Sequence, residues 1–482
     1  MRSRRPPHGV VWIVAILSTI TAGYGALRLT TARASPHKTP LAFEDARTLI
    51  DRFRADGLLP PALADKTNAD LGTVWPAWVA FRDAEIRSRL HRGDEDSVVH
   101  LWLFGTSFTA RPRATAPMLM SLSPDGRTAL LRHRLDDLIA GMRAPDGNER
   151  LVMARRVLER SGLDVMAPAG HLGAARHLET LRERMRSELQ QFRRDTVTAR
   201  ERGNTEAAFD AYLTYYQSRG LSSDTSLLAT YSVERALQDA RDSRTRAPGS
   251  IRRVAIVGPG LDFVDKAEGH DFYPPQTLQP FALVDSLIRV GLAHPDGVDV
   301  TTFDISPRVV DHLAEAHART ERGDPYVVHI PLEPDDATHT WHPDVVRYWQ
   351  HFGDRIGTEA APRPLPPSME DVRVRAVRVG PDLVRSVRSV DLNIIFEHVP
   401  ITEGEPAFDL IVATNILVYY ERFEQALALA NISAMLRPGG MFLSNGLDLP
   451  LPLSGLSAPS LVDVVFDQQH GGDTLHWFRR LP

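Results

Sequence analysis

The chain contains no cysteine, which excludes disulfides, zinc–thiolate sites and cysteine nucleophiles together. It also lacks a large excess of charge of one sign, since its formal net charge is only −5 over 482 residues. This balance argues against a protein built to neutralise phosphates, and we expect no nucleic-acid partner. Apolar residues make up 43% and charged residues 24%, which is typical of a globular chain with room for two or three domains.

Charged residues are likewise missing from residues 9–27, close to the N-terminus. Arginines precede this apolar stretch, and Ala32-Arg-Ala-Ser35 follows it as a small-x-small cleavage site. These features are typical of a secretory signal, but the stretch exceeds the usual signal core of about 7–15 residues and is long enough to span a bilayer. We therefore expect residues 1–34 to be a signal-anchor or a cleaved signal peptide that contacts the membrane through residues 9–27.

Residues 35–40 are polar and are interpreted as a linker, and residues 41–246 are predicted to form a mainly α-helical domain. Apolar residues recur there at spacings of three and four, and the charged stretch 176–202 is predicted to be a long helix with a solvated face. The clearest strand-like interruption is SVVHLWLF, residues 97–104, and we expect a strand there.

From residue 250 to residue 482, short apolar runs alternate with helix-like segments. This alternation predicts an α/β fold with a doubly wound, mostly parallel sheet and helices on both faces. The apolar runs lie at 252–257, 298–304, 372–379, 389–396, 408–413 and 440–445. Residues 460–466 and 474–478 flank a Gly-Gly-Asp turn and predict a C-terminal antiparallel hairpin.

Two of these runs end in residues suited to a nucleotide. The string VAIVGPGLD (254–262) ends in a glycine turn, in which Gly258 and Gly260 let the backbone approach a ligand. The string VTTFDISP (300–307) contains Asp304, whose carboxylate can accept both hydrogen bonds of a ribose diol. An ordinary strand–helix turn and, for Asp304, a helix cap ahead of the proline would give the same residues.

The strings FDLIVATNILVYYE (408–421) and LRPGGMFL (436–443), together with the closing hairpin, resemble class I S-adenosylmethionine-dependent methyltransferases. The resemblance covers about half of the chain, residues 250–482. Within that superfamily, TNILVYYE, DLNI (391–394) and QPFAL (279–283) are similar to segments of the chemotaxis-receptor glutamate methyltransferases. The resemblance implies a Rossmann-like methyltransferase fold and S-adenosylmethionine as the cofactor.

The same resemblance implies a cofactor-binding set. Gly258 and Gly260 would flank the methionine moiety, and Asp304 would hold the ribose hydroxyls. Leu392 and Asn393 would lie beside the adenine.

Two further residues are implied to be catalytic. Asn415 and Tyr419 would lie at the carboxyl end of the fourth strand, facing the sulfonium and the methyl acceptor. Methyl transfer is an in-line displacement, so orientation and desolvation supply most of the rate. A general base is needed only if the acceptor carries a proton.

The sequence departs from the family pattern near the glycine turn. The usual acid before the turn is absent, the third glycine is replaced, and an insertion at 264–275 follows. Asp262, Asp265 and Glu268 are candidates to replace the missing acid. The arginine of the chemotaxis type is Thr414 here. These departures favour cofactor binding over the chemotaxis acceptor specificity.

A metal site is not expected. His339 and His342 lie three residues apart beside Asp344, but Pro343 and the polar surroundings favour a fortuitous cluster.

The leading hypothesis is a methyltransferase of a small-molecule, lipid or protein side-chain acceptor, with residues 41–246 as a cap or partner-recognition domain. Because S-adenosylmethionine is cytosolic, an active enzyme would be membrane-anchored with its C-terminal domains in the cytosol. Export after cleavage near Ala34 would instead leave a non-catalytic binding protein on a degenerate scaffold. A nicotinamide-dependent oxidoreductase is a third possibility, which the hairpin and LRPGG disfavour.

Overall fold

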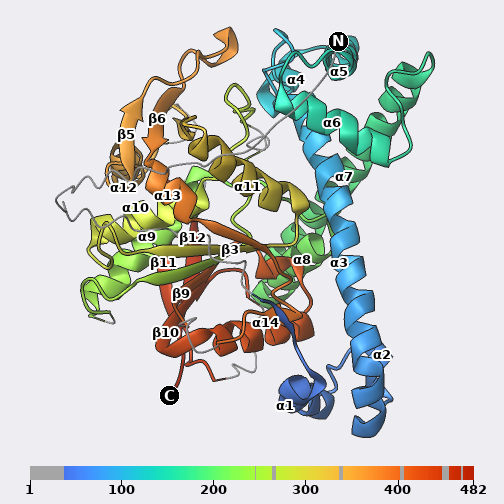
Figure 1. Ribbon diagram of the computed structural model, residues 1–482. Helices are drawn as coiled ribbons and strands as arrows, with labels where there is room; N and C mark the ends of the chain where they lie inside the picture. The colour runs from blue at the N-terminus through green and yellow to red at the C-terminus, as the bar shows by residue number, and fades with distance from the viewer. Residues whose placement is uncertain are drawn as a thin grey trace, which may run out of the picture. The chain divides into compact units, whose positions relative to one another are not determined.

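The structure is a computed structural model that describes residues 37–482 except 245, 263–267, 336–339, 402–406, 448–454 and 468–470 (Figure 1). Its largest sheet has the strand order β11-β12-β10-β9-β2-β3-β7. Neighbouring strands from β7 to β10 are parallel: β7 (Arg388–Asp391), β3 (Asp299–Asp304), β2 (Arg253–Val257), β9 (Phe408–Ala413) and β10 (Leu436–Ser444). β12 (Gly472–Arg479) is antiparallel to β10 and to β11 (Ser460–Val465). The predicted mostly parallel sheet and its closing hairpin are confirmed.

The central strands are apolar on both faces because both faces are covered. Every residue of β2 and β9 is buried. Val254 and Ile256 belong to the core on one face of the sheet, whereas Ala255 and Val257 belong to the core on the other. This alternation is the two-residue period of a strand between two helical layers, and it explains why the runs contain few polar residues.

Helices from both halves of the sequence form the two layers (Figure 1). One core contains residues of α9 (Leu227–Asp242), α10 (Gln279–Val290) and α11 (Pro307–Glu321). The other contains residues of α14 (Arg422–Met435), α1 (Phe43–Ala55) and α3 (Asn68–Phe104). The doubly wound arrangement is therefore completed by helices that precede the sheet in the sequence.

The region before the sheet is helical, as predicted. After α1 come α2 (Pro61–Ala64), α3, α4 (Ala116–Ser121), α5 (Pro124–Arg143), α6 (Glu149–Arg160), α7 (Gly170–Glu201) and α8 (Thr205–Ser218). The start of α3 is fixed by a capping box, in which Thr67 and Asp70 each bond the other's main-chain N–H. The predicted charged helix at 176–202 is the larger part of α7.

The predicted strand at residues 97–104 is wrong, because these residues form the last turns of α3. Val98, Val99, Leu101 and Trp102 are buried in a third core, which α5, α6 and α7 complete. A helix end that is covered by three others is apolar on nearly all sides, so its short β-branched and aromatic run has the composition of a strand.

The interval between β3 and β7 holds a separate antiparallel sheet with the order β4-β6-β5. Its strands are β4 (Val327–Leu332), β5 (Gly357–Ala360) and β6 (Arg373–Val379), with α12 (Pro343–His351) between β4 and β5 and α13 (Pro381–Ser386) after β6. The apolar run at 372–379 is therefore a strand, but of this sheet. The run at 389–396 supplies β7 and then turns toward β8 (Glu397–His398), which pairs with β1 (Thr39–Pro40).

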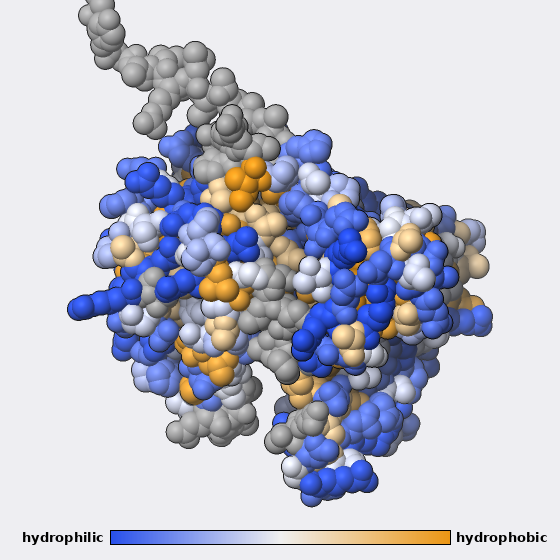
Figure 2. Space-filling view, turned by 90° about the horizontal axis from the view of Figure 1, so that it is seen from below, coloured by the Kyte–Doolittle hydropathy of each residue, from blue (hydrophilic) through white to orange (hydrophobic). Residues whose placement is uncertain are grey.

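Residues 36–482 group into one compact unit by their contacts, and the division into domains 41–246 and 250–482 stays a prediction. No helix within the described part of the chain is long and apolar enough to cross a membrane; the predicted segment 9–27 lies outside those residues. Figure 2 shows a face on which hydrophilic residues predominate and apolar residues are scattered.

Candidate functional site

The order of the parallel strands reverses between β2 and β9. The chain forms β2 first, adds β3 and β7 on one side, and then adds β9 and β10 on the other. In open α/β sheets, ligands bind outside the carboxyl ends of the strands at such a switch point. Gly258 follows β2, Asp304 ends β3, Asn393 follows β7 and Asn415 follows β9. The structure thus brings the sequence-predicted site residues to one edge of the sheet.

The glycine turn after β2 requires its glycines. Gly258 and Gly260 have φ angles of +64° and +73°, in the left-handed region that other residues avoid. A Cβ atom on Gly258 would overlap the side chain of Ile416, and one on Gly260 would lie 2.9 Å from the carbonyl oxygen of Ser223. The turn therefore requires glycine for two reasons, its positive φ and the close approach of Ile416 and Ser223.

Asp304 provides a partly buried carboxylate at the end of β3. Its Oδ1 atom accepts a hydrogen bond of 2.7 Å from the main-chain N–H of Ser306, which precedes α11. Burial raises the pKa of Asp304 to about 7, against the opposing effect of this hydrogen bond. Ser306 is the N-cap residue of α11, but no side-chain hydrogen bond caps this helix, so the contact with Asp304 is a local turn ahead of it.

Leu392 and Asn393 are buried after β7, where a helix from the N-terminal half covers them. Asn393 Nδ2 donates to Asp83 Oδ1 of α3 at 2.7 Å. One turn further along α3, Arg87 holds both carboxylate oxygens of Asp391 and donates to the carbonyl of Ile305 at 3.3 Å. α3 therefore closes the site on the side predicted for adenine. Asp83 and Arg87 were not predicted from the sequence, because nothing in it distinguishes them from the other charged residues of this helix.

Asn415 stands exposed at the carboxyl end of β9 with a φ angle of +59°. Its main-chain N–H donates to Asn445 Oδ1 at 2.6 Å, and Asn445 Nδ2 donates back to Asn415 Oδ1 at 2.9 Å. Asn445 Nδ2 also donates to Asp473 Oδ2 at 2.9 Å. Asn415, Asn445 and Asp473 thus form a hydrogen-bonded chain across the ends of three adjacent strands.

Tyr419 lies close to that chain in a 3₁₀ turn, η2 (Leu417–Tyr419), against α8. Its ring packs edge-to-face on Tyr216, with centroids 5.6 Å apart, and its carbonyl accepts a hydrogen bond from Arg89. Burial raises the pKa of Tyr419 to about 12, so its hydroxyl keeps its proton at neutral pH. The two predicted catalytic residues therefore share one end of the sheet.

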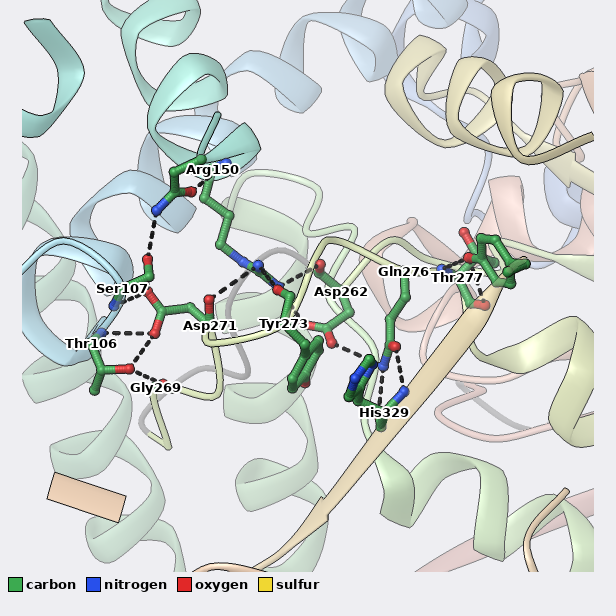
Figure 3. Close-up of polar contacts among 12 residues, drawn as sticks. Thr106, Ser107, Arg150, Asp262, Gly269, Asp271, Tyr273, Gln276, Thr277 and His329 are labelled. Atoms are coloured by element: carbon green, nitrogen blue, oxygen red, sulfur yellow. Dashed lines mark hydrogen bonds and ion pairs between the residues drawn. The ribbon is translucent and has the colours of Figure 1, made fainter. Parts of the chain in front are cut away.

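The insertion after the glycine turn is tied to the N-terminal helices (Figure 3). Asp271 accepts hydrogen bonds from the main-chain N–H and the hydroxyl of both Thr106 and Ser107, at 2.6–3.0 Å. Arg150 is buried and donates to the carbonyls of Asp271 and Tyr273. These contacts hold residues 271–273 of the insertion against the N-terminal half, so they are structural.

The candidates for the missing acid differ in their surroundings. Asp262 is buried, and its carboxylate lies 3.9 Å from the guanidinium of Arg150. Glu268 is exposed, with Arg113 at 3.9 Å, and Asp265 lies outside the described residues. Asp262 already neutralises a buried arginine, which leaves it poorly suited to bind a ligand.

The arrangement fits an adenosyl ligand. The two positive-φ glycines and the acid one strand away are the groups that such a ligand needs, and they lie at the switch point. Nothing comparable points to a metal: within the described ranges, no group of three or more His, Asp or Glu side chains is placed to hold one. His342 instead caps α12, and His339 lies outside those ranges.

No protein family matches the sequence, and no curated protein is significantly similar to it. Among solved structures, TrmN from Thermus thermophilus aligns over 52% of this chain and 49% of its own, with 12% identity and a TM-score of 0.25. The N-methyltransferase NodS from Bradyrhizobium japonicum, in complex with S-adenosylhomocysteine, aligns over 52% and 85%, with 14% identity and a TM-score of 0.25. The aligned part thus spans about half of TrmN. Because these sequence identities and TM-scores are low, we draw no functional conclusion from the solved structures and rely on the site itself.

Proposed function

We propose that the protein is an S-adenosylmethionine-dependent methyltransferase. The observation that carries this proposal is the placement of the Gly258 turn and the Asp304 carboxylate on adjacent strands at the switch point. The main chain at Gly258 and Gly260 would hold the methionine moiety, and Asp304 would accept the ribose hydroxyls. Leu392 and Asn393 would border the adenine. The cofactor supplies an electrophilic methyl group, and the protein's own groups orient the acceptor and exclude water.

The acceptor lies, in this proposal, over the carboxyl ends of β9 and β10. Asn415 is exposed there, and Tyr419, four residues later, packs its ring against Tyr216. The chemotaxis-type specificity has less support. Thr414, which stands in place of an arginine, is buried and accepts a hydrogen bond of 2.8 Å from Gln279 Nε2. This position therefore offers no positive charge to a glutamate side chain.

Calorimetric titration of the full-length protein in mild detergent with S-adenosylhomocysteine tests the proposal. We expect micromolar binding by the wild type and at least tenfold weaker binding by Asp304→Ala. Asp299→Ala is the matched control, because Asp299 is an acid at the opposite end of the same strand. Absence of binding to the folded wild type would indicate a non-catalytic binding protein on this scaffold. Binding of NADH in its place would indicate an oxidoreductase.

The compartment follows from the cofactor. Because S-adenosylmethionine is a cytosolic metabolite, we propose that residues 9–27 anchor the protein with residues 36–482 on the cytosolic side. Protease treatment of intact cells should then leave the C-terminus protected. Cleavage near Ala34 and release of the remainder would instead support the exported, non-catalytic alternative.

A further inference from the structure

The carboxyl edge of the sheet carries an acid to which the proposed function has so far assigned no role. Asp473 is the second residue of β12, which runs antiparallel to β10 and so begins at the edge where β9 and β10 end. Asn445, at the end of β10, donates one amide hydrogen to Asp473 and another to Asn415. This hydrogen-bonded chain orients the Asp473 carboxylate beside the proposed acceptor position.

The carboxylate of Asp473 is partly buried without a cationic partner. Burial raises its pKa, and the N–H groups of Asn445 and Thr474 oppose the rise. In the part of the chain that the structure describes, no Arg, Lys or His side chain forms an ion pair with Asp473. A carboxylate that has lost part of its water and accepts hydrogen bonds only from N–H groups favours a cation as its ligand.

Three aromatic rings pack together on α8 and η2. Tyr212 and Tyr216 lie one turn apart on α8 with ring centroids 4.7 Å apart, and Tyr216 contacts Tyr419. Asp473 lies close enough to Tyr212 for its negative charge to help raise the pKa of that phenol, after the larger effect of burial. Tyrosine faces attract cations by about 0.5–2 kcal/mol, in the same direction as the carboxylate.

We propose that Asp473, Asn445 and Asn415, with the tyrosines of α8 and η2, bind an amine as the methyl acceptor; this rests on the proposed function. The ammonium form binds to the Asp473 carboxylate over the tyrosine rings. One N–H bond then breaks, the proton bonds to a carboxylate oxygen of Asp473, and the electron pair stays on nitrogen. The nitrogen becomes nucleophilic only in this neutral form, so Asp473 acts as the general base.

The test measures binding rather than turnover. Full-length protein is titrated calorimetrically with 2-phenylethylamine and with its neutral isostere 2-phenylethanol, with and without saturating S-adenosylhomocysteine. We expect the amine to bind about tenfold more tightly than the alcohol, and Asp473→Asn to abolish this preference. Asp463→Asn is the matched control, because Asp463 pairs with Thr474 across the same hairpin and its side chain bonds the Thr474 hydroxyl at an exposed position. It should keep the preference.

A second variant guards against misfolding of Asp473→Asn. Tyr212→Leu removes an aromatic face from α8 and leaves the carboxylate in place, so it should weaken amine binding more than alcohol binding. Equal affinities in the wild type, or a preference that survives Asp473→Asn, would overturn the amine site. Amine preference without S-adenosylhomocysteine binding would retain the amine site and refute the methyltransferase. Binding of S-adenosylhomocysteine without a preference for the amine would refute the amine site and retain the methyltransferase.

Discussion

The guanidinium of Arg87 and the carboxylate of Asp391 are joined by two hydrogen bonds, Nη2–Oδ1 at 2.8 Å and Nη1–Oδ2 at 3.3 Å, although 304 residues separate them. The pair connects α3 to the end of β7, directly beside Asn393. α3 therefore covers the adenine side of the proposed site, and we expect it to slow entry of a ligand there. The Asp391 side chain is 50% exposed, so the pair holds α3 only weakly.

Arg87→Ala should therefore accelerate binding of S-adenosylhomocysteine. Loss of an exposed ion pair worth about 0.5–1 kcal/mol predicts an association rate about two- to fivefold higher. Stopped-flow tryptophan fluorescence measures this rate. Arg52→Ala, which removes an exposed pair with Asp56 on α1, should leave it unchanged. An unchanged or lower rate in Arg87→Ala would show that α3 does not obstruct entry.

Gly258→Ala should destabilise the protein more than Gly291→Ala does. Both glycines have positive φ, which costs a β-carbon residue about 1–2 kcal/mol, but nothing lies within 4 Å of a Cβ on Gly291. The overlap with Ile416 should add about 1–3 kcal/mol for Gly258. Urea unfolding measures both costs. In an Ile416→Ala background the extra cost should disappear; if it persists, the overlap is not its cause.

Affinity for S-adenosylhomocysteine should rise with pH up to about 7 and then level off. The ribose diol donates hydrogen bonds, so it needs Asp304 as the carboxylate, and the pKa of Asp304 is about 7. Titrations between about pH 5.5 and 8.5 should show up to a tenfold loss per pH unit below that pKa. Residual binding by Asp304→Asn should lack this dependence, because the amide does not titrate. A parallel rise in the variant would assign it to another group.

Stability should show the opposite trend. The folded-state pKa of Asp304 lies above the unfolded value of about 3.9, so the folded protein favours the protonated acid. The stabilisation is fully present below about pH 4 and is lost as the pH rises to about 7. The free energy of unfolding of Asp304→Asn, measured in urea at several pH values, should fall less steeply over this interval. Identical slopes would contradict the raised pKa.

Asp271→Ala should be strongly destabilising. The substitution leaves the main-chain N–H groups of Thr106 and Ser107 without their acceptor, a loss of about 3 kcal/mol. Asp271→Asn keeps an acceptor oxygen and should cost less. Asp324→Ala, at an exposed position, should have almost no effect. Urea denaturation measures the three costs. If Asp271→Ala costs no more than Asp324→Ala, the contact of Asp271 with the segment that follows α3 does not stabilise the fold.

The sequence predicts a strand well where both of its faces are buried, and a helix well where only one of its faces is buried. The runs around Val254 and Leu410 are apolar throughout because helices cover both sides of the sheet, and they were predicted correctly. The same reasoning failed at Trp102, where a helix end is surrounded by other helices. Short apolar runs do not distinguish these cases, because burial and not periodicity determines their composition.

Candidate site residues were found where a local motif carries them. Gly258 and Asp304 follow strands directly, so their spacing is visible in the sequence. Asn445 and Asp473 were missed, because only the pairing of β10 with β12 brings them beside Asn415. Such contacts depend on tertiary structure, and no short-range pattern records them.

The sharing of one core between the first and last described segments has a consequence for biosynthesis. Apolar residues of α1 and α3 are buried in one core with residues of α14 and β12, which the ribosome makes after them. Trp78 packs against Phe396 and against Phe423, and Phe423 belongs to α14. This core is incomplete until α14 has been synthesised, so a nascent chain stalled before α14 should expose Trp78 to chaperones and proteases more than the folded protein does.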